Sequence, residues 1–317
     1  PSTAVTFPPA GTWFKNDFNA TFDDSDTGGS GLATGQSGCQ YKFTGINVQG
    51  QDALSGDTAR TCGSSVIKNI SVGAAPDTCR YQGINTCKVE TKAFDVAGNN
   101  SGWQQRSFNV DFSAPTINAP SPTAAQAGVS TQFTSTSLQD AVGHITGCTF
   151  YTTNDNWTTW ITDSTAVSVN PSGDGESGSV SASHTFTVAG SYEARFSCSD
   201  AAGNTGWGAV SPVQVGSLSV DLNAVPSSGS VNTLFDLVAM VSGTMTGNIN
   251  YKFDCNTAQA PIWNLEINDS TQNPYTAVDL CQYASLGTYT AKVFVQRGIG
   301  TAENTVSINV GSNSIPS

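Results

Sequence analysis

The sequence predicts an all-β protein made of three consecutive β-sandwiches in a rod. Apolar and polar residues alternate along much of the chain, and no window keeps the 3.6-residue period of a helix for long enough. One alternating strand occurs three times. The composition agrees, since Asp outnumbers Glu nineteen to five, which favours turns over helices. A length of 317 residues suits three modules of roughly 100 residues each.

The strand that occurs three times reads TCKVETKAF from Thr86, SYEARFSC from Ser191 and TYTAKVFVQ from Thr288. In each copy, every second residue is apolar or small, and most of the residues between them are polar or charged. This period of two is typical of a strand with one buried face. In the last two copies the strand opens with a glycine two residues before Tyr192 or Tyr289. That arrangement resembles the tyrosine corner of immunoglobulin-like sandwiches, whose phenol hydroxyl bonds to upstream backbone.

A second shared strand lies upstream in each third, as GCQYKF at Gly38, GCTFYT at Gly147 and INYKFDC at Ile249. Between the thirds, the segment DFSAPTI at 111–117 is typical of a linker, and VGSLSVDLNAVP at 215–226 opens a new unit. We therefore expect three domains, at residues 1–113, 114–216 and 217–317.

Two nearly identical phrases, DVAGN from Asp95 and DAAGN from Asp200, follow the repeated strand, and Ala114-Pro115 closes one linker. With these motifs, residues 1–216 resemble two tandem bacterial Ig-like repeats of the D-x-A-G-N type. Residues 217–317 resemble a PKD-like domain, although Cys255-Asn256 stand where a Gly-Asp-Gly turn usually follows the aspartate. The resemblance implies β-sandwiches used as spacers, adhesins or accessory domains of bacterial surface proteins.

Eight cysteines occur without any CxxC pair, which favours disulfides and an extracellular or cell-surface location. Cys148 and Cys198 are the only cysteines of the second third, and Cys255 and Cys281 are the only ones of the last third. Each of these two couples is expected to form a disulfide.

The first third has four cysteines, and the strand register restricts how they pair. Cys87 aligns with Tyr192, which lies roughly 20 Å along the strand from the position of Cys198. A disulfide needs Cα atoms within about 7 Å, so Cys39–Cys87 is disfavoured. The preferred pairing is Cys39–Cys62 with Cys79–Cys87, and the alternative is Cys39–Cys79 with Cys62–Cys87.

Aspartates are expected to gather where the second strand and the D-x-A-G-N loop of a sandwich meet the preceding linker. In the second module these are Asp111, Asp140 and Asp200, and in the first they are Asp23, Asp24, Asp26 and Asp95. Carboxylate oxygens are ligands for Ca²⁺, which is the one candidate cofactor, although the sequence requires none. The competing interpretation is that Asp95 and Asp200 only accept backbone N–H bonds within their own loops.

Nothing in the sequence predicts catalysis. His144 lies in a turn and His184 in an alternating strand, and the chain has neither a P-loop nor a zinc motif. The net charge of −12 argues against nucleic acid, and no apolar stretch approaches the ~18 residues that span a bilayer. Trp157 and Trp160 either pack against the protein or stack on sugar rings.

These observations predict a non-enzymatic, extracellular structural or spacer segment of a bacterial cell-surface protein, such as a stalk, surface layer or filament building block. Its expected partners are other copies of itself or surface proteins. The alternative is an adhesin or a carbohydrate-binding accessory module of a secreted protein, with glycans as partners.

Overall fold

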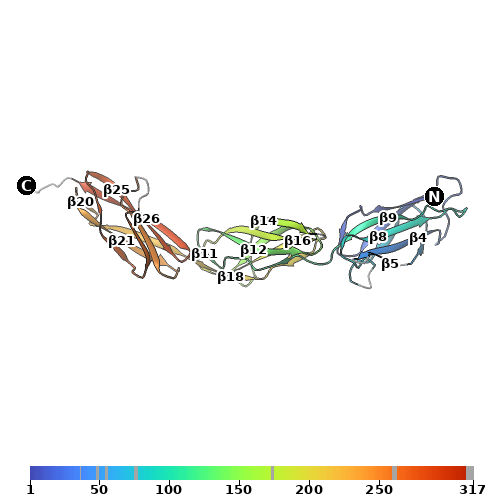
Figure 1. The fold of residues 1–317 in the computed structure, drawn as a ribbon, viewed down its shortest axis with the longest axis horizontal. Helices are drawn as coiled ribbons and strands as arrows, with labels where there is room; N and C mark the ends of the chain where they lie inside the picture. The colour runs from blue at the N-terminus through green and yellow to red at the C-terminus, as the bar shows by residue number, and fades with distance from the viewer. Residues whose placement is uncertain are drawn as a thin grey trace, which may run out of the picture.

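A computed structural model describes residues 1–35, 37–47, 50–53, 56–74, 78–172, 175–258 and 263–311. Across these residues the chain forms strands and loops and contains no helix. Consequently no described helix has the length and apolar character needed to cross a bilayer. Three β-sandwiches lie end to end in an elongated molecule (Figure 1). The predicted all-β fold of consecutive sandwiches is confirmed.

The N-terminal sandwich packs a three-stranded sheet, in the order β1-β3-β7, on a larger sheet in the order β2-β9-β8-β4-β5, with β6 paired to β4. Its strands are β1 (Ser2–Phe7), β2 (Trp13–Phe14), β3 (Phe18–Ser25), β4 (Cys39–Asn47), β5 (Gly50–Ala53), β6 (Thr58–Arg60), β7 (Val66–Ile70), β8 (Gly83–Ala93) and β9 (Gln104–Val110).

The middle sandwich is one continuous sheet in the order β10-β12-β15-β14-β13-β16-β18-β11, with β17 paired to β16. The two layers are joined by β14, whose residues 161–164 pair with β13 and whose residues 165–172 pair with β15. Its strands are β10 (Thr116–Ile117), β11 (Ala124–Gln126), β12 (Ser130–Asp140), β13 (Ile145–Thr153), β14 (Ile161–Ser172), β15 (Gly175–Thr185), β16 (Gly190–Asp200), β17 (Thr205–Trp207) and β18 (Ser211–Gly216).

The C-terminal sandwich has sheets in the orders β19-β21-β24 and β20-β26-β25-β22-β23. This strand order matches that of the N-terminal sandwich, including a short strand that runs parallel to the last one, β2 on β9 and β20 on β26. Its strands are β19 (Leu218–Val225), β20 (Ser228–Ser230), β21 (Leu234–Gly243), β22 (Ile249–Asp254), β23 (Leu265–Ser270), β24 (Tyr275–Gln282), β25 (Gly287–Arg297) and β26 (Gly300–Gly311).

Each sandwich has its own hydrophobic core, and the three clusters of buried residues share no member. Aromatic rings fill the centre of each core because they bury the most apolar surface per side chain. The largest are Phe22 and Phe108 in the first core, Phe133, Phe150 and Phe196 in the second, and Phe235, Tyr251 and Phe253 in the third.

The strand that occurs three times in the sequence is β8, β16 and β25, and each of these occupies an inner position of its sheet. Residues at every second position are buried, as the alternation predicts. The two expected tyrosine corners are present. The Tyr192 hydroxyl donates to the Val188 carbonyl at 3.0 Å, and the Tyr289 hydroxyl donates to the Ser285 carbonyl at 3.0 Å.

Candidate metal centre

The first D-x-A-G-N loop is closed by its own aspartate. The Asp95 carboxylate accepts the Asn99 backbone N–H at 2.8 Å and the Asn99 side-chain amide at 2.8 Å. The Asp95 N–H in turn donates to the Asn99 carbonyl at 2.9 Å. Gly98 has φ of 86°, a left-handed conformation that disfavours a side chain. Asp95 therefore acts within its loop, as the second interpretation of this motif expected.

The second loop repeats these contacts and adds one across the joint between sandwiches. The Asp200 carboxylate accepts the Asn204 backbone N–H and side-chain amide, each at 2.9 Å. The Asn204 amide also donates to the backbone carbonyl of Asp111 at 3.0 Å. A loop of the middle sandwich is thereby bonded to the segment that leaves the N-terminal sandwich.

The structure brings together the three aspartates that the sequence placed at this joint. Asp111 follows β9, Asp140 ends β12 and Asp200 ends β16. One carboxylate oxygen from each lies within 4.8 Å of the others. All three residues are buried, with exposed fractions of 0%, 3% and 3%. Three carboxylates from three separate segments thus converge at a buried site.

The hydrogen-bond donors to this cluster among the described residues are neutral groups. Asp111 Oδ1 accepts the Ser113 N–H at 2.9 Å, and Asp140 Oδ1 accepts the Gly143 N–H at 3.0 Å. The Oδ2 atoms of Asp111 and Asp140 are buried without any hydrogen-bond partner. The ion pairs found among the described residues involve other carboxylates.

Burial, together with the neighbouring charges of Asp140 and Asp200, raises the pKa of Asp111 to about 6, although the hydrogen bond from the Ser113 N–H acts in the opposite direction. The raised pKa of Asp111 means that its ionised form is unfavourable beside the other two carboxylates unless a cation or a proton offsets the charge.

Gly143 forms the wall of the cluster. A Cβ atom at this position would clash with Asp111 Oδ2 and come within 3.2 Å of Asp140 Oδ2. In the sequence, the only signal for Gly143 is its place three residues after Asp140. Because the backbone approaches the carboxylates this closely, any larger residue would obstruct the space between them.

Further contacts across the same joint surround the carboxylates. The Lys15 ammonium of the N-terminal sandwich donates to the Gly203 carbonyl in the second D-x-A-G-N loop. The Trp13 ring lies edge-on to the His144 ring, with centroids 5.9 Å apart. His144 Nδ1 also lies 3.1 Å from the Glu176 carboxylate, so this histidine has structural contacts.

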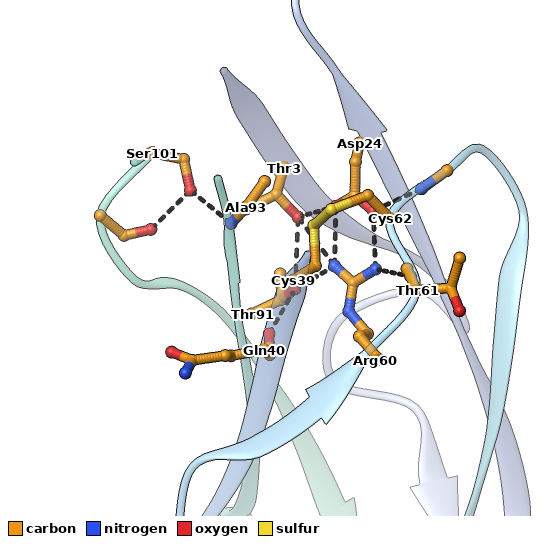
Figure 2. Close-up of a disulfide and its surroundings, with 12 residues drawn as sticks. Thr3, Asp24, Cys39, Gln40, Arg60, Thr61, Cys62, Thr91, Ala93 and Ser101 are labelled. Atoms are coloured by element: carbon orange, nitrogen blue, oxygen red, sulfur yellow. Dashed lines mark hydrogen bonds and ion pairs between the residues drawn. A yellow bond between two sulfur atoms is a disulfide. The ribbon is translucent and has the colours of Figure 1, made fainter. Parts of the chain in front are cut away.

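The N-terminal sandwich has a guanidinium group beside the carboxylate that corresponds to Asp140. Asp24 lies at the end of β3, as Asp140 lies at the end of β12. Arg60 pairs with both oxygens of Asp24, at 2.6 and 2.7 Å, and both side chains are fully buried (Figure 2). The Thr3 hydroxyl at 2.5 Å and the Gly63 N–H at 3.0 Å also donate to Asp24.

Burial disfavours ionisation of Asp24, but the hydrogen bonds from Arg60, Thr3 and Gly63 outweigh it and hold the pKa below its ordinary value. Arg60 itself donates to the Thr91 hydroxyl at 2.6 Å and lies over the Phe22 ring at 4.6 Å. Both carboxylate oxygens of Asp24 and both terminal nitrogens of Arg60 are thus bonded in the core, while the Arg60 Nε is buried without a partner among the described residues.

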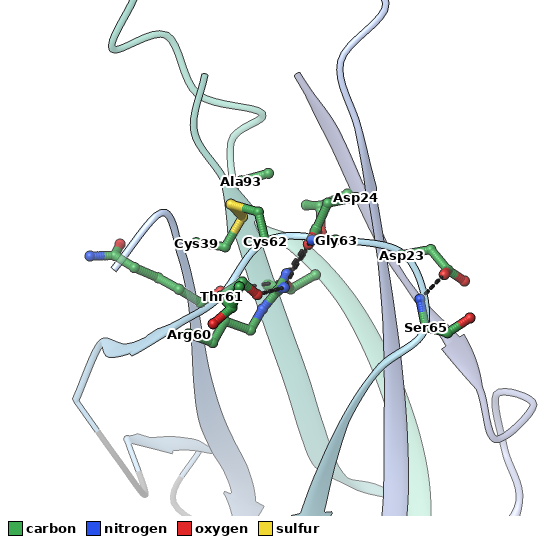
Figure 3. A network of polar contacts seen from close by, with 12 residues as sticks. Asp23, Asp24, Cys39, Arg60, Thr61, Cys62, Gly63, Ser65 and Ala93 are labelled. Atoms are coloured by element: carbon green, nitrogen blue, oxygen red, sulfur yellow. Dashed lines mark hydrogen bonds and ion pairs between the residues drawn. A yellow bond between two sulfur atoms is a disulfide. The ribbon is translucent and has the colours of Figure 1, made fainter. Parts of the chain in front are cut away.

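The four aspartates expected to form a metal site in the first module do not gather. Asp23 accepts the Thr6 hydroxyl and the Ser65 N–H and points away from Asp24 (Figure 3). Asp26 accepts the Gly28 N–H at 3.0 Å, and Asp95 closes its own loop. The expectation of calcium at this end is therefore corrected. Asp24 is already paired with Arg60, a residue that carried no signal in the sequence.

Four disulfides are present in the described residues, at Cys39–Cys62, Cys79–Cys87, Cys148–Cys198 and Cys255–Cys281. In the first module this is the preferred pairing of the two considered. Asp24 also lies near Cys39 and Cys62, but their sulfur atoms are bonded to each other and are not metal ligands (Figure 2). Disulfides in every sandwich are typical of extracellular proteins.

Cys148 and Cys198 lie directly opposite each other on β13 and β16. Their disulfide therefore joins neighbouring strands of one sheet. In the N-terminal sandwich the corresponding pair on β4 and β8 is Cys39 and Ala93. Cys39 bonds instead to Cys62, which follows β6.

Trp157 and Trp160 lie on one loop but have different surroundings. Trp157 has φ of 64°. The Arg195 guanidinium lies over two indole rings, with its carbon 4.2 Å from the ring centroid of Trp157 and 4.2 Å from that of Trp207. Trp160 is 56% exposed and lies beside an open groove. Packing thus accounts for Trp157 and leaves Trp160 free to contact a ligand.

The other histidine, His184, is buried on β15. Its Nδ1 lies 2.6 Å from the Asp163 carboxylate, and its ring packs edge-on to Phe186. These contacts are structural, in line with the sequence analysis.

No protein-family model matches the chain, and no curated protein matches it. Among solved structures, it is similar to the fibronectin(III)-like modules of Clostridium thermocellum CbhA, at 18% identity over 64% of this chain and 97% of that one, with a TM-score of 0.30. The ICAM-5 D1–D4 ectodomain fragment is 11% identical over 98% and 75% of the two chains, with a TM-score of 0.35. A tetra-tandem repeat from the extending region of a large adhesion protein is 13% identical over 98% and 74%, with a TM-score of 0.28. Identities and TM-scores this low add little to what the chain's own strand order already defines. That order makes the protein a tandem array of Ig-like β-sandwiches.

Proposed function

We propose that the chain is a non-enzymatic structural segment of a bacterial cell-surface protein, serving as a stalk or as a building block of a surface layer or filament. The observation that carries this proposal is the arrangement of three sandwiches in line, each with its own core and at least one disulfide. Such units fold separately and transmit load along the rod. We divide them into domains at residues 1–113, 114–216 and 217–317.

We assign the first two domains to bacterial Ig-like repeats and the third to the PKD-like type. The matching Asp–Asn loops of the first two support the assignment. In the third domain, Gly298 and Ile299 form a tight hairpin between β25 and β26 in place of that loop.

The same proposal includes a calcium ion at the joint between the first two domains, held by Asp111, Asp140 and Asp200. Calcium binds oxygen at about 2.3–2.6 Å, so two of its ligands lie at most about 5 Å apart. The 4.8 Å limit on the carboxylate oxygens satisfies this condition. The donor set contains only oxygen, which suits a hard cation and not zinc or copper. The unpartnered Oδ2 atoms of Asp111 and Asp140 are the expected ligands.

Calorimetric titration tests this site. Wild-type protein is expected to bind calcium, and a concentration of a hundred times Kd should raise the free energy of unfolding of the middle domain by about 2.7 kcal/mol. The Asp200→Asn variant should lose both effects. Asp95→Asn is the matched control, because Asp95 makes the same loop contacts outside the cluster. Absence of calcium uptake by the wild type, or equal loss in both variants, would contradict the site.

A second function, glycan binding by an adhesin or accessory module, is favoured by the groove beside Trp160. Hydroxyl and amide groups line it together with exposed apolar surface, and its lining includes no charged side chain. Its lining includes Asn154, Thr159, Trp160, Val188 and Tyr192. An exposed indole beside such groups suits a neutral sugar ring.

Electron microscopy and a glycan array distinguish the two functions. A building block should form ordered polymers through contacts above roughly 1,000 Å², and a passive stalk should remain monomeric and bind no glycan. Monomers that bind a glycan would favour the second function. That binding should be lost in Trp160→Ala and kept in Trp103→Ala, since Trp103 packs against Lys42 and Lys92 in another domain.

A further inference from the structure

The two joints of the rod are built differently. Residues 111–115 separate β9 from β10, whereas Ser217 alone separates β18 from β19. A shorter connection has fewer rotatable bonds and allows fewer relative orientations of the domains it joins. The contacts around each connection make the two joints differ further in how freely the domains can reorient.

The second joint is held by an amide that bonds to the backbone of the next domain. The Gln126 side chain donates to the Thr301 carbonyl at 2.7 Å and accepts the Thr301 N–H at 2.8 Å. Gln126 is 9% exposed, so these bonds are shielded from water. A pair of hydrogen bonds on one residue fixes both the distance and the rotation between the domains.

Around the connecting residue, the second joint is also closely packed. The Ser217 carbonyl accepts the N–H groups of Thr244 and Met245 at 3.0 and 3.1 Å, and the Ser217 N–H donates to the Thr244 hydroxyl at 2.9 Å. The Met245 side chain fills the space beside Gly216 and Gly300, where a Cβ would meet it. All of these contacts are between uncharged groups, so they do not depend on ions.

The first joint depends on charge. Its longer linker carries Asp111 into contact with Asp140 and Asp200, and the three carboxylates repel one another. The contacts across the joint that oppose this repulsion are those of Lys15 and Asn204 at the loop 200–204 and the ring contact between Trp13 and His144. Without a cation, the repulsion is relieved when the linker carboxylate moves away from the other two.

The N-terminal domain does not share this dependence. Arg60 supplies a cation to Asp24 from within the chain, and the pair is fully buried. The fold of that domain therefore stays intact when external cations are removed.

We infer that calcium controls the stiffness of only one of the two joints. This inference rests on the proposed calcium site. With calcium bound, both joints are rigid and the molecule is a straight rod. When calcium is removed, the first joint becomes a hinge, while the second joint and all three domains keep their structure.

Distances between pairs of spin labels placed on either side of each joint, measured by electron–electron double resonance, test this inference. All described cysteines are in disulfides, so the labels are introduced through unnatural amino acids. Exposed positions on the three domains are Gln105, Ser183 and Asp221. The 105–183 distance reports on the first joint and the 183–221 distance on the second. Both distributions should be narrow in calcium, and chelation should broaden only the first.

Two variants make the result specific. Asp140→Asn should keep the first joint broad even in calcium, and Gln126→Ala should broaden the second joint with or without calcium. Calorimetric calcium titration of the labelled protein distinguishes failure of the hinge from failure of the calcium site. If calcium binds and the first distribution does not narrow, or if chelation broadens both, the single hinge is wrong and the site stands. If calcium does not bind, the site itself is wrong.

Discussion

Replacing Arg60 by methionine is expected to destabilise the N-terminal domain by about 3–5 kcal/mol, because Asp24 is then buried without its counter-charge. Differential scanning calorimetry should show one transition moving to lower temperature. The transitions of the other two domains should not move, since their cores share no residue with the first.

The double variant Asp24→Leu/Arg60→Met is the control for this prediction. Replacing both charges by apolar groups removes the uncompensated carboxylate, and buried ion pairs exchanged in this way commonly lose little stability. The double variant should therefore be more stable than Arg60→Met alone. Equal stability of the two would show that the ion pair is not the reason for the loss.

Removing the Cys148–Cys198 disulfide by substituting both residues with alanine should destabilise the middle domain by about 4 kcal/mol. The estimate follows from the entropy that the cross-link removes from the unfolded chain when it closes a loop with a sequence separation of 50. Urea titration monitored by tryptophan fluorescence measures the loss.

The matched comparison is the Cys79→Ala/Cys87→Ala variant, whose sequence separation is 8. The same relation gives about 2.5 kcal/mol for that shorter loop, in the N-terminal domain. A larger loss from the short loop than from the long one would contradict the entropic account.

Much of this fold could be predicted from the sequence, because period-two alternation is a local property. A strand with one buried face requires it, and β8, β16 and β25 show it in the structure. The tyrosine corners at Tyr192 and Tyr289 follow from the same register. Register also separated Cys39 from Cys87, and the structure pairs each with a different partner.

Other features depend on which segments meet in space. Arg60 belongs to the short strand β6 and has no sequence signal, yet it enters the core and pairs with Asp24, 36 residues away. Gly143 limits the space beside the three carboxylates. The contact between Gln126 and Thr301 joins residues 175 apart. Side chains that meet over such separations leave no periodic pattern in the sequence.

The two D-x-A-G-N phrases separate what the sequence determines from what the tertiary structure decides. The sequence by itself determined their loop, because an Asp and an Asn four residues apart bond to each other and to the same backbone groups in both copies. Only the tertiary structure decided the surroundings. Asp200 meets Asp140 and the linker carboxylate of Asp111, whereas in the other copy Asp24, the counterpart of Asp140, meets Arg60. The physical reason is that local hydrogen bonds are encoded by neighbours in the chain, while the balance of buried charge is set by segments that only folding brings together.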